Sequence, residues 1–288
     1  RFGNPHSADH RHGWDAAEAV DRARDQVGRL IGARGREIIF TSGATESNNL
    51  AIKGVARARR RKEGRDRVIT LESEHKCVLE SAARLRGDGF QVDILPVGQD
   101  GLLDPDHLRA AMDERVAIVS VMGVNNEIGV IQPLKQISEI VHAAGGLLHS
   151  DGAQAVGKIA IDVQAMGIDL MSISGHKLYG PKGIGALFIR RRPKVPIDPL
   201  MDGGGQEMGL RSGTLAPPLC VGLGKACVLA GKEMEAEAQR LAALRDRFCD
   251  LVAEAVPEAS INGDMKARVA GNISLTFPGM EPGELMSA

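Results

Sequence analysis

Aromatic residues and cysteines are scarce in this sequence. Phenylalanine, tryptophan and tyrosine make up only 3% of the 288 residues, so aliphatic side chains are expected to fill the core. The four cysteines form no Cys-x-x-Cys pair and show no metal-ligand spacing, which argues against a zinc site. In a chain of this length we expect them to be reduced thiols, as in a cytosol-like compartment.

Long apolar runs and a strong net charge are also absent. No apolar run is long enough to span a bilayer, and the first residues lack the apolar core of a signal peptide. The formal net charge of −1 gives no reason to expect nucleic acid or an anionic membrane as a partner. The basic run at 57–67 has no interleaved aromatic residues for base stacking, so a solvated helix end is expected there. The chain begins at Arg1, which is compatible with a processed or partial segment.

Strand and helix patterns alternate along the chain. Helical spacing of apolar residues predicts helices at 14–31, 45–60, 133–144 and 218–256, the third with Pro133 at its first helical position. Strand-like segments occur at 37–41, 68–71, 91–95, 116–122, 147–150, 170–174, 184–190 and 272–277. This alternation predicts an α/β fold in which helices cover both faces of a mostly parallel sheet.

One interruption of this pattern indicates two domains. Pro193–Gly205 contains several prolines and a Gly-Gly-Gly run, and a long helical stretch follows it. We place the boundary inside that helix, giving a large domain at 1–233 and a small C-terminal α+β domain at 234–288. The small domain is expected to be incomplete, because the sequence pattern at the end of the chain is that of a helix.

An acid and a lysine follow two neighbouring predicted strands. Asp151 ends the run Leu147-Leu-His-Ser-Asp, and Lys177 follows a strand in Ser172-Ile-Ser-Gly-His-Lys. In open α/β sheets, ligands bind beyond the carboxyl ends of the strands. Pyridoxal phosphate needs such a pair, with a lysine that forms a Schiff base and a carboxylate that keeps the ring nitrogen protonated. Taken singly, Asp151 also fits a helix N-cap and Lys177 a solvated surface lysine.

Other polar residues at the same predicted edge have two interpretations each. Thr45 begins a helix after a glycine turn, which suits either an anion site or an ordinary N-cap. His75 could stack on a cofactor ring and move a proton, or be a loop histidine without a role. Asn126 is either a turn former or a donor to a ring oxygen, and Gln154 is placed to reach that same oxygen. Ser174, Gly175 and His176 directly precede Lys177 and could hold a phosphate.

Several motifs together resemble a known family. They are Thr41-Ser-Gly-Ala-Thr-Glu-Ser, Glu74-His-Lys, Val124-Asn-Asn-Glu-Ile-Gly, Asp151-Gly-Ala-Gln-Ala-Val-Gly-Lys, Ser172-Ile-Ser-Gly-His-Lys and Arg211-Ser-Gly-Thr. In these motifs the chain is similar to the cysteine desulfurases of iron–sulfur cluster assembly, which are class-V aminotransferase-like enzymes. The resemblance runs from residue 2 to about residue 286 and is greatest to the bacterial housekeeping and mitochondrial branch.

The resemblance implies a homodimer with the aspartate-aminotransferase fold (fold type I) and pyridoxal 5'-phosphate on Lys177. It implies that His75 stacks over the ring and assists proton transfer, while Asp151 pairs with the ring nitrogen. It also implies that Gln154 and Asn126 contact the ring oxygen. The residues that would hold the phosphate are Ala44, Thr45, Ser174, Gly175 and His176, with Thr214 contributed by the partner subunit.

The implied reaction converts L-cysteine to L-alanine and passes the sulfur as a persulfide to an iron–sulfur scaffold protein or another acceptor. The implied compartment is the bacterial cytoplasm or the mitochondrial matrix. The family's nucleophilic cysteine lies in a Ser-Ser-Gly-Ser-Ala-Cys motif that these 288 residues lack, and Cys77 is expected to be non-catalytic. Two alternatives remain open. One is a catalytically silent cofactor-binding or assembly protein, and the other is a selenocysteine lyase or aminotransferase of the same fold.

Overall fold

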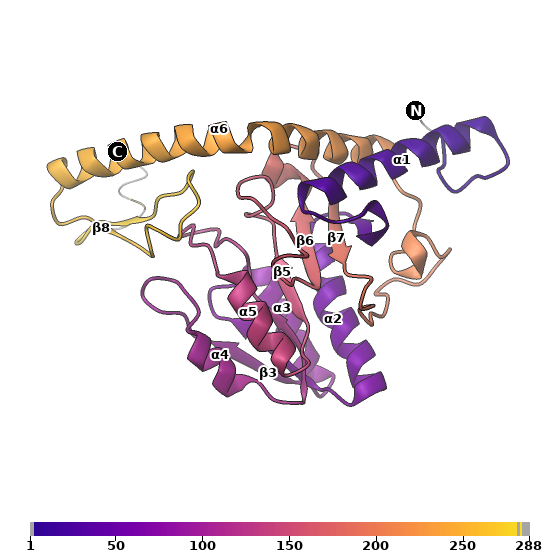
Figure 1. Cartoon of the computed structure of the whole chain (residues 1–288), viewed down its shortest axis with the longest axis horizontal. Helices are drawn as coiled ribbons and strands as arrows, with labels where there is room; N and C mark the ends of the chain where they lie inside the picture. Colours follow the sequence, from indigo (N-terminus) through magenta and orange to yellow (C-terminus); the bar gives the residue numbers. More distant parts are fainter. Residues whose placement is uncertain (1–2, 281–282, 284–288) are drawn as a thin grey trace.

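The computed structural model describes residues 3–280 and Gly283. At its centre lies a seven-stranded sheet with the strand order β1-β7-β6-β5-β4-β2-β3 (Figure 1). The strands are β1 (Ile38–Thr41), β2 (Arg67–Leu71), β3 (Gln91–Leu95), β4 (Val116–Ser120), β5 (Leu148–Asp151), β6 (Leu170–Ser174) and β7 (Gly185–Ile189). β7 runs antiparallel to both of its neighbours, and the other four pairings are parallel. The prediction of a mostly parallel sheet is therefore confirmed.

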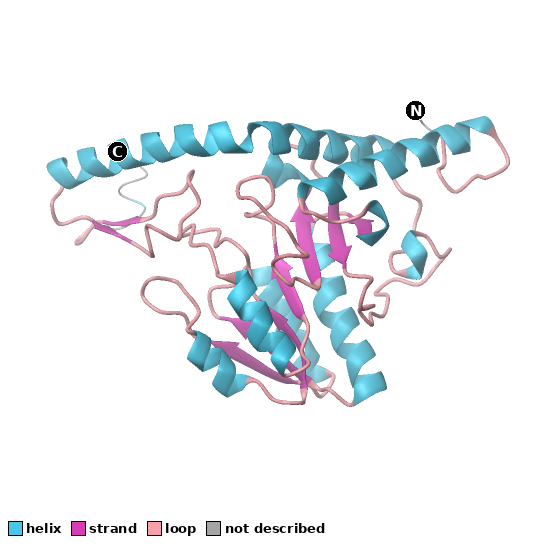
Figure 2. Cartoon of the chain, in the orientation of Figure 1, coloured by secondary structure: helices cyan, strands magenta, loops and turns pink. Residues whose placement is uncertain are grey.

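Helices cover both faces of the sheet, as Figure 2 shows. They are α1 (Arg11–Leu30), α2 (Ala44–Glu63), α3 (Lys76–Gly87), α4 (Pro105–Ala111), α5 (Leu134–Ala143) and α6 (Pro217–Ala255). One apolar cluster joins α2 and α3 to one face, with Leu50 and Val78 packed among strand residues. A second cluster joins α1, α4, α5 and α6 to the opposite face. Successive strand side chains alternate between these clusters, which explains why most strands are buried throughout.

The structure corrects several predicted boundaries. Pro133 is the N-cap of α5 rather than its first helical residue, and Glu37 belongs to a short 3₁₀ turn (Gly35–Glu37) before β1. The strand predicted at 272–277 is only β9 (Leu275–Thr276), paired with β8 (Ser260–Ile261). α4 was missed, although the Asp104 cap followed by Pro105 is a recognised helix start. The helix predicted at the end of the chain falls largely outside the described residues.

The long helix α6 spans the predicted domain boundary. It has 39 residues, and its buried residues all lie between Pro217 and Cys227. Its second half extends past the sheet toward the β8–β9 pair (Figure 1). The division at residue 233 stays a prediction. Over the described part of the chain, no helix combines the length and apolar character needed to cross a membrane.

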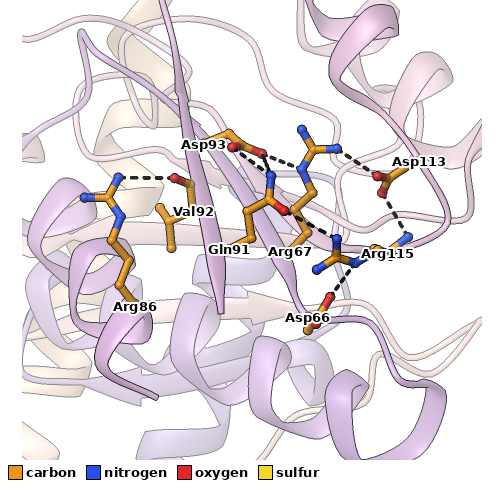
Figure 3. A network of polar contacts seen from close by, with 8 residues as sticks. All are labelled: Asp66, Arg67, Arg86, Gln91, Val92, Asp93, Asp113 and Arg115. Atoms are coloured by element: carbon orange, nitrogen blue, oxygen red, sulfur yellow. Dashed lines mark hydrogen bonds and ion pairs between the residues drawn. The ribbon is translucent and has the colours of Figure 1, made fainter. Parts of the chain in front are cut away.

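The amino ends of β2, β3 and β4 are held by a network of ion pairs (Figure 3). Arg67, at the start of β2, contacts Asp93 and lies 2.8 Å from Asp113. Arg115 pairs with Asp66 at 2.9 Å. Oppositely charged side chains therefore pair with one another at this end of the sheet.

A buried ion pair fastens the loop after β7 to the body of the protein. Both oxygens of Glu207 accept hydrogen bonds from Arg24, at 2.7 and 2.8 Å, and the backbone N–H of Phe40 also donates to Glu207. The Arg24 guanidinium lies over the Phe40 ring, 4.9 Å from its centroid. The Glu207 side chain is only 2% exposed, so Arg24 is the partner that compensates for its removal from water.

We therefore expect Arg24→Met to lower the free energy of unfolding by about 3–5 kcal/mol, because it strands a buried carboxylate. Urea unfolding followed by circular dichroism measures this loss. Arg22→Met is the matched control, since the Arg22–Glu18 pair is exposed and such pairs contribute under about 1 kcal/mol. Equal effects of the two substitutions would contradict the assignment.

Candidate active site

The carboxyl ends of the strands open into a cavity of about 540 Å³. Its walls come from the loops and helix starts that follow β1, β2, β4, β5 and β6. The lining includes most of the residues singled out in the sequence, namely Ala44, Thr45, His75, Asn126, Asp151, Gln154, Ser174, His176 and Lys177. The rule that parallel strands deliver their following loops to the same edge predicts this gathering, except for Ala44, which only the family resemblance implied.

Two of the predicted residues do not line this cavity. Gly175 is buried behind it, and its N–H donates to the Ile184 carbonyl at 3.0 Å. A Cβ at Gly175 would lie 2.8 Å from that same oxygen, so the position has no room for a side chain. Thr214 is exposed and lies outside the lining.

Lys177 lies in a short 3₁₀ turn (Gly175–Leu178) directly after β6. The turn ends at Tyr179, whose left-handed backbone lets the Gly180 N–H reach back to the Gly175 carbonyl at 2.9 Å. This closure projects Lys177 from the end of the sheet, so that it lines the first cavity and also a second one of about 370 Å³. The second cavity lies against α6 and shares Asn126 and Gln154 with the first.

Asp151 ends β5 and is almost fully buried. Burial raises its pKa, although hydrogen bonds from the Ala153 N–H (2.9 Å) and from Asn48 (2.7 Å), together with nearby His75, act in the opposite direction. In the described part of the chain it forms no ion pair with a lysine or arginine. A buried carboxylate without a cation is costly, so the site favours a cationic ligand group at this point.

The start of α2 offers an anion site. The first-turn amides of a helix have no intrahelical partners, and Ala44 and Thr45 carry two of them to the cavity wall. Glu46 lies in the same turn, where Arg211 contacts it at 2.8 Å and the Ser42 N–H donates to it. These hydrogen bonds outweigh burial and lower the pKa of Glu46. Its charge is thus neutralised locally, which leaves the helix start available to an anion.

His75 caps the start of α3. Its Nδ1 accepts from the Cys77 N–H at 3.1 Å and lies 3.0 Å from the Cys77 Sγ. The preceding residue, Glu74, is buried and accepts a hydrogen bond from the Met122 N–H at 2.5 Å. The loop that carries His75 is therefore pinned to the segment after β4.

Asn48, Glu74 and Cys77 were not assigned to the site from the sequence. Asn48 lies on the buried face of α2, and its position one turn after Thr45 was the available signal. Burial raises the pKa of the Cys77 thiol, which agrees with the expectation that Cys77 is not a nucleophile.

Glu74 gives a testable pH dependence. Burial raises its pKa well above the ordinary value of 4.5, and the nearby Asp151 charge acts in the same direction. The pKa of Glu74 is therefore higher in the folded chain than in the unfolded chain. The free energy of unfolding is greatest below about pH 4 and is lost as the pH rises through the folded-state pKa. Between the unfolded-state and folded-state pKa the loss is up to about 1.4 kcal/mol per pH unit. We expect Glu74→Gln to reduce this loss, because the amide oxygen still accepts from Met122.

Urea unfolding at several pH values from 4 to 8 measures the effect. The stability advantage of Glu74→Gln over the parent chain should grow with pH. Glu72→Gln, which alters an exposed carboxylate of the same loop, is the control. Parallel stability curves for the Glu74 variant and the parent would contradict the assignment.

Known proteins resemble this chain over nearly its whole length. The Aminotransferase class-V family model matches residues 1–288. A probable mitochondrial cysteine desulfurase of Dictyostelium discoideum is 51% identical over 287 residues, which are 100% of this chain and 63% of that protein. The cysteine desulfurase IscS of Rickettsia rickettsii (strain Iowa) is 52% identical over 286 residues, 99% of this chain and 69% of that protein. A solved NifS-like protein has a TM-score of 0.93 at 36% identity, covering 99% of this chain and 77% of its own. The chain thus spans less than two thirds of the Dictyostelium protein.

Proposed function

Because the chain belongs to the class-V aminotransferase family, within its cysteine desulfurase branch, we propose that it forms the cofactor-binding part of a cysteine desulfurase. Its fold is the type I fold of pyridoxal-phosphate enzymes, as the motifs implied. Members of this family depend on pyridoxal phosphate. The activity, substrate and partners given below are proposals for the protein to which these residues belong.

The single observation that supports this function most is that Lys177 and Asp151 both line the same cavity. Among the described residues no lysine or arginine pairs with the buried Asp151 carboxylate, which fits a protonated ring nitrogen, and Lys177 would supply the amine that attaches the cofactor. When bound, pyridoxal phosphate supplies an electron sink for charge that develops beside the substrate amine. Asp151 would stabilise the protonated ring nitrogen, and His75, which lines the same cavity, is the proposed residue for proton transfer.

The phosphate would lie at the start of α2. Ala44 and Thr45 offer helix-start amides there, and Ser174 and His176 line the same cavity, with the Ser174 hydroxyl 3.2 Å from His176 Nδ1. Gln154 and Asn126 would contact the ring oxygen. The remaining contact, Thr214, would come from a second subunit, and its exposure supports this homodimer proposal.

L-cysteine is the proposed substrate, and the second cavity beside Lys177 gives it an approach. Lys158 lines that cavity, where burial and the nearby Lys177 charge lower its pKa. The products would be L-alanine and a persulfide, passed to an iron–sulfur scaffold protein or another acceptor. Relatives named as mitochondrial and bacterial support the mitochondrial matrix or the bacterial cytoplasm as the compartment.

The persulfide-forming cysteine is the part that we do not assign to these residues. None of the four cysteines lies in a Ser-Ser-Gly-Ser-Ala-Cys motif, and the buried Cys220 and Cys227 have their pKa raised to about 12. A thiolate is needed for sulfur attack, so neither is suited to it.

The test compares this chain with the full gene product, both loaded with pyridoxal phosphate and given L-cysteine and a thiol reductant. The chain should change its cofactor absorbance on addition of L-cysteine but form less than one alanine per subunit. The full product should release alanine and sulfide in equal amounts over many turnovers. Alanine formed only from selenocysteine, a keto acid product, or no turnover by the full product would overturn the proposal.

A further inference from the structure

A fully buried amide, Asn48, touches two residues of the cavity wall. Its Nδ2 atom lies 2.7 Å from Asp151 Oδ2 and 3.1 Å from the Cys77 sulfur. An amide nitrogen carries two hydrogens, so both contacts can be donated at once. The Asp151 oxygen can only accept while the carboxylate is ionised, which fixes the orientation of the Asn48 amide. Its Oδ1 atom is buried and has no partner in the part of the chain that the structure describes.

Cys77 continues this path to His75. Its sulfur accepts from Asn48, so the thiol hydrogen is available for His75 Nδ1, which lies 3.0 Å away. The backbone N–H of Cys77 also donates to Nδ1, at 3.1 Å. The backbone N–H alone requires that Nδ1 be the acceptor, and the thiol hydrogen then shares the single lone pair of Nδ1. The neutral imidazole must then carry its hydrogen on Nε2, which makes no hydrogen bond with the residues described.

The protonation state of the Cys77 thiol agrees with its role as the donor to His75 Nδ1. Burial is the main cause of the raised pKa of Cys77, and the Asp151 and Glu74 charges add to it, although hydrogen bonds with Asn48 and Thr45 act against it. The sulfur therefore keeps its hydrogen at neutral pH, as a donor must. A nucleophilic cysteine would need a lowered pKa, because the thiolate is the reactive form.

We propose that Asn48 and Cys77 are positioning residues that connect Asp151 to His75 through one continuous set of hydrogen bonds and hold His75 as its Nε2–H tautomer. The proposal deepens the proposed function, on which the roles of Asp151 and His75 rest. Its consequence is specific: His75 presents a hydrogen, rather than a lone pair, to a ligand in the cavity. Asn48 donates to one Asp151 oxygen and thereby fixes the orientation of the carboxylate before any ligand binds.

The first experiment examines the thiol itself, in the chain without cofactor. The S–H stretching band of Cys77 is isolated by subtracting the infrared spectrum of Cys77→Ser from that of the parent. A hydrogen-bonded thiol absorbs at lower wavenumber, so His75→Phe should shift the Cys77 band upward. Cys249→Ser, which removes a thiol far from the cavity wall, should leave this band unchanged. An identical Cys77 band in the parent and in His75→Phe would overturn the link.

The second experiment measures pyridoxal-phosphate binding by the same chain. Asn48→Leu removes a hydrogen bond to a charged group, so the dissociation constant should rise by about 10-fold or more. Cys77→Ser keeps a donor and an acceptor and should bind like the parent, whereas Cys77→Ala should weaken binding by less than Asn48→Leu does. Unchanged binding by Asn48→Leu would overturn the role of Asn48. If no variant, nor the parent, binds the cofactor, the proposed function fails, while the infrared result still decides the link.

Discussion

Replacing Lys177 with alanine is expected to abolish covalent attachment of pyridoxal phosphate to this chain. Lys177 is placed by β6 and by a closed 3₁₀ turn, and it lines both cavities of the site. Lys158 lines only the second cavity and Lys182 only the first, so neither occupies the position that Lys177 holds between the two. The loss should therefore be complete for attachment, while noncovalent binding at the start of α2 and at Asp151 persists.

The measurement is intact mass after borohydride reduction. The parent chain should gain the mass of one reduced cofactor, and Lys177→Ala should gain none. In the full gene product, the same substitution should lower turnover, because the cofactor is no longer held by a covalent bond to the protein.

Lys182→Ala is the matched control for attachment. Lys182 lines the same cavity but follows the turn that closes at Gly180, so its amine lacks the support given to Lys177. This variant should be labelled like the parent. A reducible adduct that survives in Lys177→Ala, or one that disappears in Lys182→Ala, would remove Lys177 as the anchor.

The site residues at the carboxyl ends of the strands could be predicted from the sequence, because each follows a local pattern that is recognisable by itself. Asp151 and Lys177 follow short apolar strands, and strand–helix alternation implies parallel strands that end on one side. The position of Pro133 was wrong by one residue, since a proline suits both the cap and the first helical position. Local pattern alone does not distinguish these two.

The supporting residues of the site could not be predicted in this way. Asn48 meets Asp151 and Cys77 only because α2 packs across the sheet, over 100 residues from Asp151 in the chain. Glu74 likewise finds Met122 through the neighbouring strands β2 and β4. Such contacts depend on helix-to-sheet packing and strand order, which a single sequence does not specify.

Asp151→Asn is the second substitution with a large expected effect, and it should separate binding from catalysis. Asparagine has nearly the same shape and keeps one acceptor for the Asn48 or Ala153 hydrogen bonds, so cofactor binding should persist. The ring nitrogen, however, loses its anionic partner. Hydrogen bonds to charged groups contribute about 1.5–3 kcal/mol, so turnover by the full gene product should fall by at least about 10- to 100-fold.

The absorbance of the bound cofactor and a control substitution at a second buried aspartate distinguish the role of Asp151 from a general effect of burial. The absorbance of the bound cofactor should change its pH dependence in Asp151→Asn, because the charge next to the ring nitrogen has been removed. Asp169→Asn is the control, since Asp169 is equally buried but pairs with Arg190 (3.2 Å) and His142 (2.8 Å) outside the cavity. That variant should lose stability without altering the cofactor absorbance. Unchanged turnover and spectra in Asp151→Asn would mean that the buried carboxylate at the end of β5 does not face the ring nitrogen, and the proposed mechanism would lose its electrostatic basis.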